Sequence, residues 1–219
     1  MASKYLTTSI LINSDEPAAA ALLKDFVDQI DCLVFDETVI VDTSETYVQY
    51  HLAGNPAAIF RFKVYCSGYA IFYCDIYKDN VLIHTAGCSA SKSTGTFYLR
   101  AISSPAGFVF EGLYDAGSYW VRGAFIGEDG DWYILDARNA TMYDTKTFGG
   151  SSFDSCFYSA LDANGKYLLT PLRMISGGSI SPVSLHGCYG IFAFTGDRSF
   201  LTLTDGRHAF YIGNKIYVL

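Results

Sequence analysis

Acidic side chains are the most concentrated group of chemically capable residues in this chain. Glu128, Asp129 and Asp131 surround one Asp-Gly turn, and Asp136 and Asp144 follow shortly after. A glycosidase needs two carboxylates about 5–9 Å apart across a cleft, and Ca²⁺ needs oxygen ligands at alternating positions of a loop. This stretch is too short for an EF-hand and has no matching glutamate downstream. We therefore interpret it as a solvated turn and predict no metal site; a glycosidase-type enzyme using Glu128 or Asp131 is the least favoured function.

The chain shows no recognisable set of nucleophile, base and orienting carboxylate. The glycine-serine stretches at 149–152 and 176–179 lack the Gly-x-Ser-x-Gly elbow of serine hydrolases. The four histidines are scattered along the sequence, and neither a phosphate loop nor a dinucleotide fingerprint occurs. We predict no catalytic residue and no cofactor, and expect the protein not to be an enzyme.

The cysteines are even in number but do not follow a metal-binding spacing. The six are Cys32, Cys66, Cys74, Cys88, Cys156 and Cys188. None forms a Cys-x-x-Cys pair, so a zinc site is not expected. In a cytoplasm the preferred interpretation is buried free thiols that act as small apolar side chains. The alternative is a disulfide between Cys66 and Cys74, since eight residues can span a hairpin.

The aromatic content is unusually high, with 17 Tyr, 16 Phe and 2 Trp. Both tryptophans stand beside a tyrosine, as Tyr119-Trp120 and Trp132-Tyr133. Successive side chains of a strand point to opposite faces, so one ring of each pair is expected on the outside. Exposed rings of this kind suit contacts with sugars or protein partners. We predict these four residues as candidate contact aromatics, and a location of all four in the core remains the alternative.

Charge and hydrophobicity exclude several classes of function. The 219 residues are 50% hydrophobic and 17% charged, with a net charge of −7 and no cluster of basic residues. Binding to nucleic acid or to an anionic membrane is therefore disfavoured. No run approaches the length of a transmembrane helix. The N-terminal residues do not form a secretory signal, so we expect synthesis in a cytoplasm.

The elements begin with an N-terminal arm and one helix, assigned to residues 1–30. The apolar run at 10–12 is predicted as an edge strand or an arm. Ser14-Asp15-Glu16-Pro17 then has the residues of a helix start. The spacing that follows predicts a helix over 17–30, and its apolar face is formed by Leu22, Leu23, Phe26, Val27 and Ile30.

From Cys32 onward the sequence is typical of an antiparallel β protein. Segments rich in β-branched and aromatic residues, such as 38–50, 58–65, 69–77 and 119–126, are separated by turn signals every 8–12 residues. The predicted fold is mainly β, an antiparallel β-sandwich or barrel with one short N-terminal helix and a C-terminal β-meander. We assign 31–148 to a main β-domain and 149–219 to a smaller β-unit packed on it, with the boundary at Gly149-Gly150.

The last thirty residues contain two hairpin signals, Asp205-Gly206 and Gly213-Asn214. The final strand, which runs to the last residue, is predicted to be covered by a sheet or a neighbouring subunit. It is formed by Lys215, Ile216, Tyr217, Val218 and Leu219, which we take as a candidate assembly strand.

This tyrosine-rich chain resembles the small β-rich virion proteins of tailed bacteriophages, which include tail, baseplate, neck and capsid-decorating components. The residues that carry the resemblance are the glycine-serine break near Leu172–Ile180 and the closing Thr204-Asp205-Gly206-Arg207 and Tyr211-Ile212-Gly213-Asn214-Lys215-Ile216. The resemblance implies a non-enzymatic building block that assembles with itself, as a homo-oligomer, and with other virion proteins. It also implies a location in the virion.

The sequence thus leads to a structural or assembly protein of a virion, made in a host cytoplasm, with β-edges and aromatic faces as its contacts. The alternative is a carbohydrate- or receptor-binding β-sandwich in which Trp120 and Trp132 form a platform for a glycan.

Overall fold

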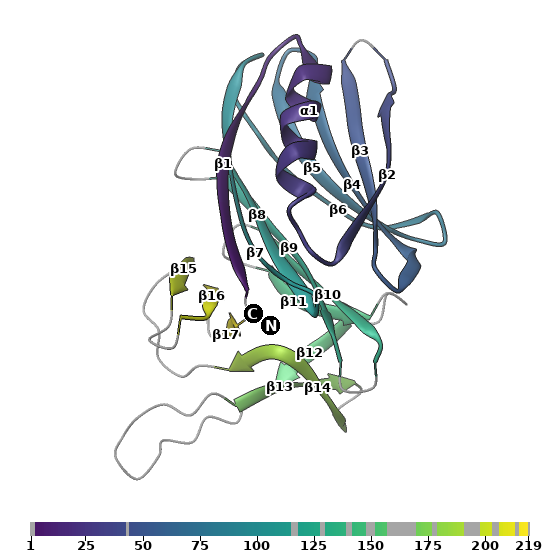
Figure 1. Cartoon of the computed structure of the whole chain (residues 1–219), viewed down its shortest axis with the longest axis vertical. Coiled ribbons are helices and arrows are strands. Elements are labelled where there is room, and N and C mark those ends of the chain that lie inside the picture. The colour runs from purple at the N-terminus through teal and green to yellow at the C-terminus, as the bar shows by residue number, and fades with distance from the viewer. Residues whose placement is uncertain are drawn as a thin grey trace.

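A computed structural model of the chain describes residues 3–42, 44–114, 118–127, 130–138, 142–147, 152–156, 170–176, 179–190, 198–202, 206–212 and 215–218. They form two antiparallel sheets and one α-helix (Figure 1). The five-stranded sheet contains, in spatial order, β2 (Leu33–Ile40), β3 (Glu45–Leu52), β4 (Asn55–Cys66), β5 (Ala70–Lys78) and β6 (Val81–Ser89).

The second sheet has twelve strands. In spatial order these are β1 (Lys4–Ile12), β7 (Gly95–Ser104), β8 (Gly107–Tyr114), β9 (Ser118–Ile126), β10 (Trp132–Arg138), β11 (Met142–Thr147), β12 (Ser152–Cys156), β13 (Thr170–Ser176), β14 (Ser179–Gly190), β17 (Lys215–Val218), β16 (His208–Ile212) and β15 (Arg198–Thr202). The mainly β fold is confirmed, with a sandwich as the arrangement of the described residues. The C-terminal meander is confirmed as β15, β16 and β17.

The five-stranded sheet is a run of hairpins, each fixed by local turn chemistry. Asp79 and Asn80 have positive φ values of 49° and 65° and join β5 to β6, as a two-residue hairpin loop requires. The stretch 38–50, expected to be one continuous β segment, is divided between β2 and β3. In the turn that divides it, the carboxylate of Asp42 accepts hydrogen bonds from the backbone N–H and the hydroxyl of Ser44, and this local bonding reverses the chain.

The predicted helix is confirmed as α1 (Glu16–Val27), although it ends earlier than expected. The carboxylate of Asp15 caps it by accepting the N–H of Ala18 at 3.2 Å, and Pro17 lies in its first turn. The prediction that Leu22 belongs to the apolar face is wrong, because this side chain is 55% exposed. The buried face is centred on Leu23 and Phe26, and position 22 lies about 100° away from position 23 around the helix.

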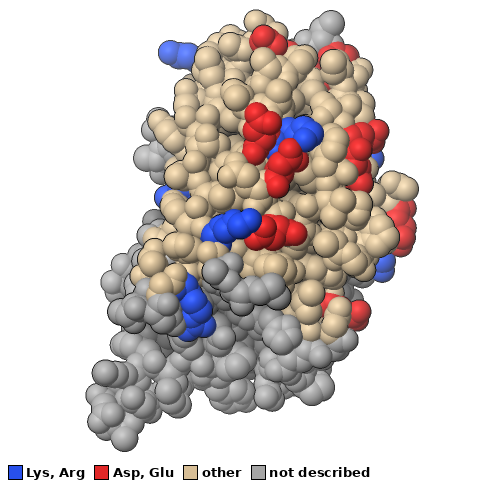
Figure 2. Space-filling model, in the orientation of Figure 1, with Lys and Arg blue, Asp and Glu red and all other residues tan. Residues whose placement is uncertain are grey.

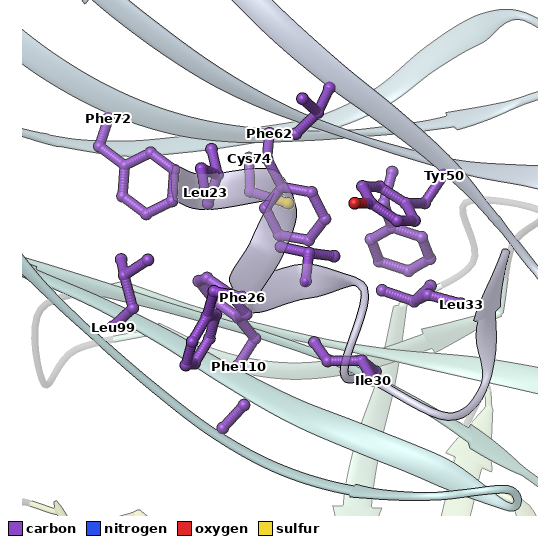
Figure 3. Packing of buried hydrophobic residues seen from close by; sticks show 14 of the residues in the cluster. Leu23, Phe26, Ile30, Leu33, Tyr50, Phe62, Phe72, Cys74, Leu99 and Phe110 are labelled. Carbon is purple, nitrogen blue, oxygen red and sulfur yellow. The ribbon is translucent and has the colours of Figure 1, made fainter. Parts of the chain in front are cut away.

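Helix α1 lies between β1 and the strands β3 and β4, across the open side of the two sheets (Figure 1). The core between the sheets is rich in phenylalanine. Phe62 and Phe72 from the five-stranded sheet contact Phe110 on β8, and Phe26 of α1 meets the same ring at 5.6 Å (Figure 3). The hydroxyl of Tyr50 donates a hydrogen bond to the carboxylate of Asp28 at 2.8 Å and so ties the end of α1 to β3.

The larger sheet also covers its own second face. Strand β14 contacts β9, and β16 contacts β7, so parts of β7–β9 have protein on both sides. The result is visible in β8, where the first six residues are all buried.

The N-terminal segment is the edge strand β1, the first of the two predicted alternatives, and it pairs with β7. Strands β11 and β12 pair on either side of the proposed boundary, so both proposed units contribute to the twelve-stranded sheet. The boundary residues 149–150 lie outside the described residues, and the division stays a prediction. In the part of the chain that the structure describes, no helix has the length and hydropathy needed to cross a membrane.

Candidate functional site

The outer face of the five-stranded sheet combines tyrosines with charged side chains. In β3, Thr46, Val48, Tyr50 and Leu52 are buried, while Glu45, Tyr47, Gln49 and His51 are half-buried on the opposite face. Because the strands are in register, the outward side chains of β4 and β5 stand in rows beside them. We call this surface the tyrosine–arginine face; its members are Glu45, Tyr47, Gln49, Arg61, Lys63, Tyr65, Tyr73, Asp75, Tyr77 and Thr85.

Arg61 lies at the centre of one end of this face. Its guanidinium carbon is 4.3 Å from the ring centre of Tyr77 and 5.0 Å from that of Tyr47. The Nε–H of Arg61 donates to Oε1 of Gln49 at 2.7 Å. The three neighbours hold the planar guanidinium in one position, so little side-chain entropy remains to be lost on binding.

Lys63 lies at the centre of the other end of the tyrosine–arginine face. Its Nζ lies 3.0 Å from Oδ2 of Asp75 and 3.3 Å from Oε1 of Glu45. The hydroxyl of Thr85 donates to the second oxygen of Asp75. Together with Tyr65 and Tyr73 these groups line a shallow pocket of about 240 Å³. The lining of the pocket is therefore mainly polar, with two tyrosines among its residues.

The protonation of Lys63 follows from these partners. Burial by itself would lower the pKa of Lys63, but the hydrogen bond to Asp75 and the charges of Asp75 and Glu45 outweigh it, and the pKa is raised above the usual value. The amine thus stays charged near neutral pH and is unsuited to nucleophilic attack. Burial, with smaller contributions from Tyr65 and Asp75, raises the pKa of Tyr73, which stays a neutral hydroxyl. The groups of the pocket are arranged for hydrogen bonding and stacking.

The predicted contact aromatics lie elsewhere, and the expectation that one ring of each pair is outside is wrong. Tyr119, Trp120, Trp132 and Tyr133 are all buried, with at most 7% of any residue exposed. Trp120 is in the core, where its Nε1–H donates to the carbonyl of Phe72 at 3.1 Å and its ring stacks on Phe110. Strand β9 is covered by β14 on its other side. Alternation places the two rings of each pair on opposite faces of the sheet, but both of these faces are buried here.

The expected role of the C-terminal strand also needs correction. Lys215, Ile216, Tyr217 and Val218 form β17, which pairs with β14 on one side and β16 on the other. A strand paired on both sides has no free edge to offer another subunit, so the assembly-strand interpretation of these four residues is wrong. Leu219 lies outside the described residues.

Four cysteines are described as free thiols, which overturns the alternative of a disulfide between Cys66 and Cys74. In the hairpin of β4 and β5, Cys66 stands opposite Ala70, whereas Cys74 stands opposite Phe62, so the two thiols are not cross-strand neighbours. Cys66 donates to the carbonyl of Ser93 at 2.8 Å. Burial confirms the preferred interpretation for Cys32, Cys74 and Cys88. The side chains of Cys156 and Cys188 lie outside the described part.

The acidic turn is only partly described. Glu128 and Asp129 fall outside the described residues, Asp131 is exposed, and Asp136 faces Asp144 in the backbone register of β10 and β11. Within the described ranges no group of three His, Cys, Asp or Glu side chains is placed to hold a metal ion.

Sequence reasoning missed the tyrosine–arginine face, although a local signal for it exists. In three consecutive strands, at 45–51, 61–65 and 73–77, tyrosines and polar residues alternate with residues that are mostly apolar. Such alternation marks the outward face of a half-buried strand. No protein-family model, curated protein or solved structure matches this chain.

Proposed function

We propose that the protein is a non-enzymatic assembly protein that contacts other proteins through the tyrosine–arginine face. The observation that carries the proposal is Arg61, fixed between the rings of Tyr47 and Tyr77 by Gln49. Tyr and Arg are enriched among the residues that dominate binding energy in protein interfaces. Rigid rings and a pre-positioned guanidinium lose little conformational entropy when a partner covers them.

The charges at the other end of the face support recognition rather than turnover. Lys63 is held protonated between two carboxylates, which gives a partner fixed donors and acceptors to match. The context that we propose, the virion of a tailed bacteriophage, rests on the sequence resemblance alone. In that context the partners are further copies of this chain or other virion proteins.

Light scattering on the purified chain over a range of concentrations tests the assembly proposal. We expect an oligomer, and we expect Arg61→Ala and Tyr77→Ser to weaken its association by at least about tenfold. Tyr98→Ser is the matched control, because Tyr98 is an exposed tyrosine on β7 of the other sheet. Thermal unfolding of each variant shows whether the fold is intact.

A strict monomer at high concentration that also fails to co-purify with phage particles on a density gradient would contradict the proposal. Association that Tyr98→Ser weakens as much as Tyr77→Ser does would exclude this face as the contact.

The shallow pocket favours a second candidate, a glycan-binding β-sandwich. Paired carboxylates, an ammonium group and a hydroxyl surround a space of about 240 Å³ that two tyrosines flank, and sugars offer hydroxyls to such groups and flat apolar patches to rings. Screening on a glycan array tests this function. Lys92 is an exposed lysine that does not line the pocket, so Lys92→Met is the control. We expect Lys63→Met to abolish binding and Lys92→Met to preserve it, and an array without any bound glycan counts against this function.

A further inference from the structure

Strand β1 is an open edge of the twelve-stranded sheet. It pairs with β7 without interruption from Lys4 opposite Ser103 to Ile12 opposite Gly95, and β7 is its single neighbour among the strands that the structure describes. In an antiparallel pair, alternate residues direct their N–H and C=O groups away from the partner strand. The free side of β1 therefore presents backbone donors and acceptors along nine residues.

The sequence of β1 lacks the features that usually prevent further pairing. Edge strands are normally protected by bulges, prolines or charges, or by a helix or loop that covers the edge. Helix α1 lies beside β1 but leaves a groove between the two elements. Strand β2, an edge of the other sheet, follows this rule, with a bulge between Phe35 and Glu37 and the acidic Asp36 at that point. In contrast, β1 contains no proline and a single charged residue, Lys4, which is bound to Asp31 at 2.5 Å.

A groove runs between β1 and helix α1. It has a volume of about 220 Å³ and is lined by Leu6, Thr7, Thr8 and Ser9 of the strand and by Leu22, Asp25, Phe26 and Gln29 of the helix. Leu22 is 55% exposed and lines this groove, so an apolar side chain of α1 is accessible to an occupant here. The strand supplies hydrogen bonds, and the helix supplies the apolar Leu22 and Phe26 beside the polar Asp25 and Gln29.

The charge of the groove comes from Asp25. The neighbouring Asp28 is bound to Lys24 at 2.6 Å and Asp31 is bound to Lys4, whereas the exposed carboxylate of Asp25 has no ion pair in the described part of the chain. On the face seen in Figure 2, some basic and acidic side chains lie next to one another and others stand apart. An occupant of the groove would thus meet one unneutralised negative charge.

We propose that this groove binds an extended peptide segment of another protein, which adds to the sheet as a strand beside β1. Its alternate apolar side chains pack on Leu6 and Leu22, and one basic side chain pairs with Asp25. Peptides bind other proteins by strand addition in this way, with main-chain hydrogen bonds for affinity and side-chain pockets for specificity. The β1 of a second copy carries one basic residue, Lys4, which is already bound to Asp31. It would therefore bring no free basic side chain to Asp25, which disfavours a second copy as the occupant.

An array of random peptides with the length of β1, nine residues, provides the probe. We expect the peptides bound by the native chain to be enriched in alternating apolar residues and to contain Lys or Arg. Asp25→Lys should weaken binding of these peptides about tenfold or more and shift the selection toward Asp and Glu. Glu37→Lys on β2 makes the same charge change on an exposed strand outside the groove and should leave the selection unchanged.

Hydrogen exchange locates the bound peptide. The amides of residues 4–12 that face the free edge should become protected when the best peptide is added. Two modified peptides are then compared, one N-methylated at its odd positions and one at its even positions. Only one of them should lose binding, because only alternate amides of an added strand bond to β1. Selection of the same peptides by the native chain and by Asp25→Lys would overturn the proposal, as would an array with no peptide bound. A dimer of the native chain that dissociates in whichever of the folded variants Thr7→Pro and Thr8→Pro loses only a free-edge amide would replace the peptide by a second copy. These results do not depend on Arg61 or Tyr77, so this inference and the proposed function can fail separately.

Discussion

Gly112 on β8 is the residue that lets the largest side chain of the core fit. A Cβ atom at this position would lie 2.7 Å from the indole ring of Trp120 and 2.9 Å from the ring of Phe72. Both rings are fully buried and in contact with each other, so neither can move without disturbing its neighbours.

We therefore predict that Gly112→Ala destabilises the fold by about 1–3 kcal/mol through overpacking. Urea unfolding followed by tryptophan fluorescence measures the effect, because Trp120 reports on this region. Ser89→Ala, an exposed strand position, is the control and should change the stability little. An unchanged unfolding midpoint for Gly112→Ala would show that the two rings leave room for a methyl group.

Cys66 differs from the other described thiols in being half-exposed. Burial, with a small contribution from Glu16, raises the pKa of the Cys66 thiol, and burial raises the pKa of Cys88 to about 12. Only the thiolate reacts with disulfide reagents. Because the pKa of both thiols is raised, the exposure of each cysteine, more than its acidity, determines which one reacts first.

The expected outcome at pH 8 is that Cys66→Ser removes one slowly reacting thiol from the native protein, whereas Cys74→Ser removes none. A colorimetric thiol assay gives both numbers, and the same assay in denaturant should find all six cysteines reduced in the native sequence. Four reactive thiols in denaturant would instead restore the disulfide interpretation of Cys66 and Cys74.

Helix α1 is the element that closes the open side of the sandwich, and its first turn depends on one side chain. Asp15 caps the N–H of Ala18, and both Pro17 and the acidic Glu16 suit the positive end of the helix. At the other end, Tyr50 bonds Asp28 and the carbonyl of Lys24. The helix is therefore held at both ends by hydrogen bonds and along its length by Leu23 and Phe26.

Asp15→Ala should lower the free energy of unfolding by about 1 kcal/mol, the usual cost of a lost N-cap. Chemical denaturation provides the measurement, and Asp15→Asn, which keeps an acceptor oxygen, should recover most of the loss. Equal losses for the two substitutions would indicate that charge, rather than capping, is what position 15 contributes.

At the scale of the whole molecule, β1 and β17 have opposite positions. The segment nearest the N-terminus forms an edge, and the segment nearest the C-terminus is inserted between β14 and β16. In a strand paired on both sides every amide lies in a ladder, whereas in an edge strand every second amide faces outward.

We predict that Tyr217→Pro abolishes cooperative unfolding, because Tyr217 faces Cys188 on one side and Phe210 on the other. Proline in β1 should behave differently. Of Thr7→Pro and Thr8→Pro, one removes an amide bonded to β7 and the other an amide at the free edge, so only one should be strongly destabilised. Thermal unfolding by circular dichroism distinguishes these results. A stable Tyr217→Pro variant would contradict the central position of β17.

Local sequence patterns were enough to predict the class of the fold, the helix and many of the turns. These features depend on residues close in the chain: the apolar spacing and cap of α1, the positive φ of Asp79 and Asn80, and the alternation in β3 to β5. The turn at 41–44 was missed because its signal is the hydrogen bonding of one aspartate side chain to Ser44.

Which faces and edges of the sheets are open depends on packing between distant parts of the chain. Alternation assigns Trp120 and Tyr119 to opposite faces of β9, but it says nothing about what covers each face, and that depends on contacts with Phe72, 48 residues away in the chain, and with β14. Likewise β17 is internal because of its pairing with β14, and β1 is open because no described strand pairs with its second side. Local residue patterns fix how a strand divides its side chains, and long-range packing fixes which of those side chains remain accessible to another molecule.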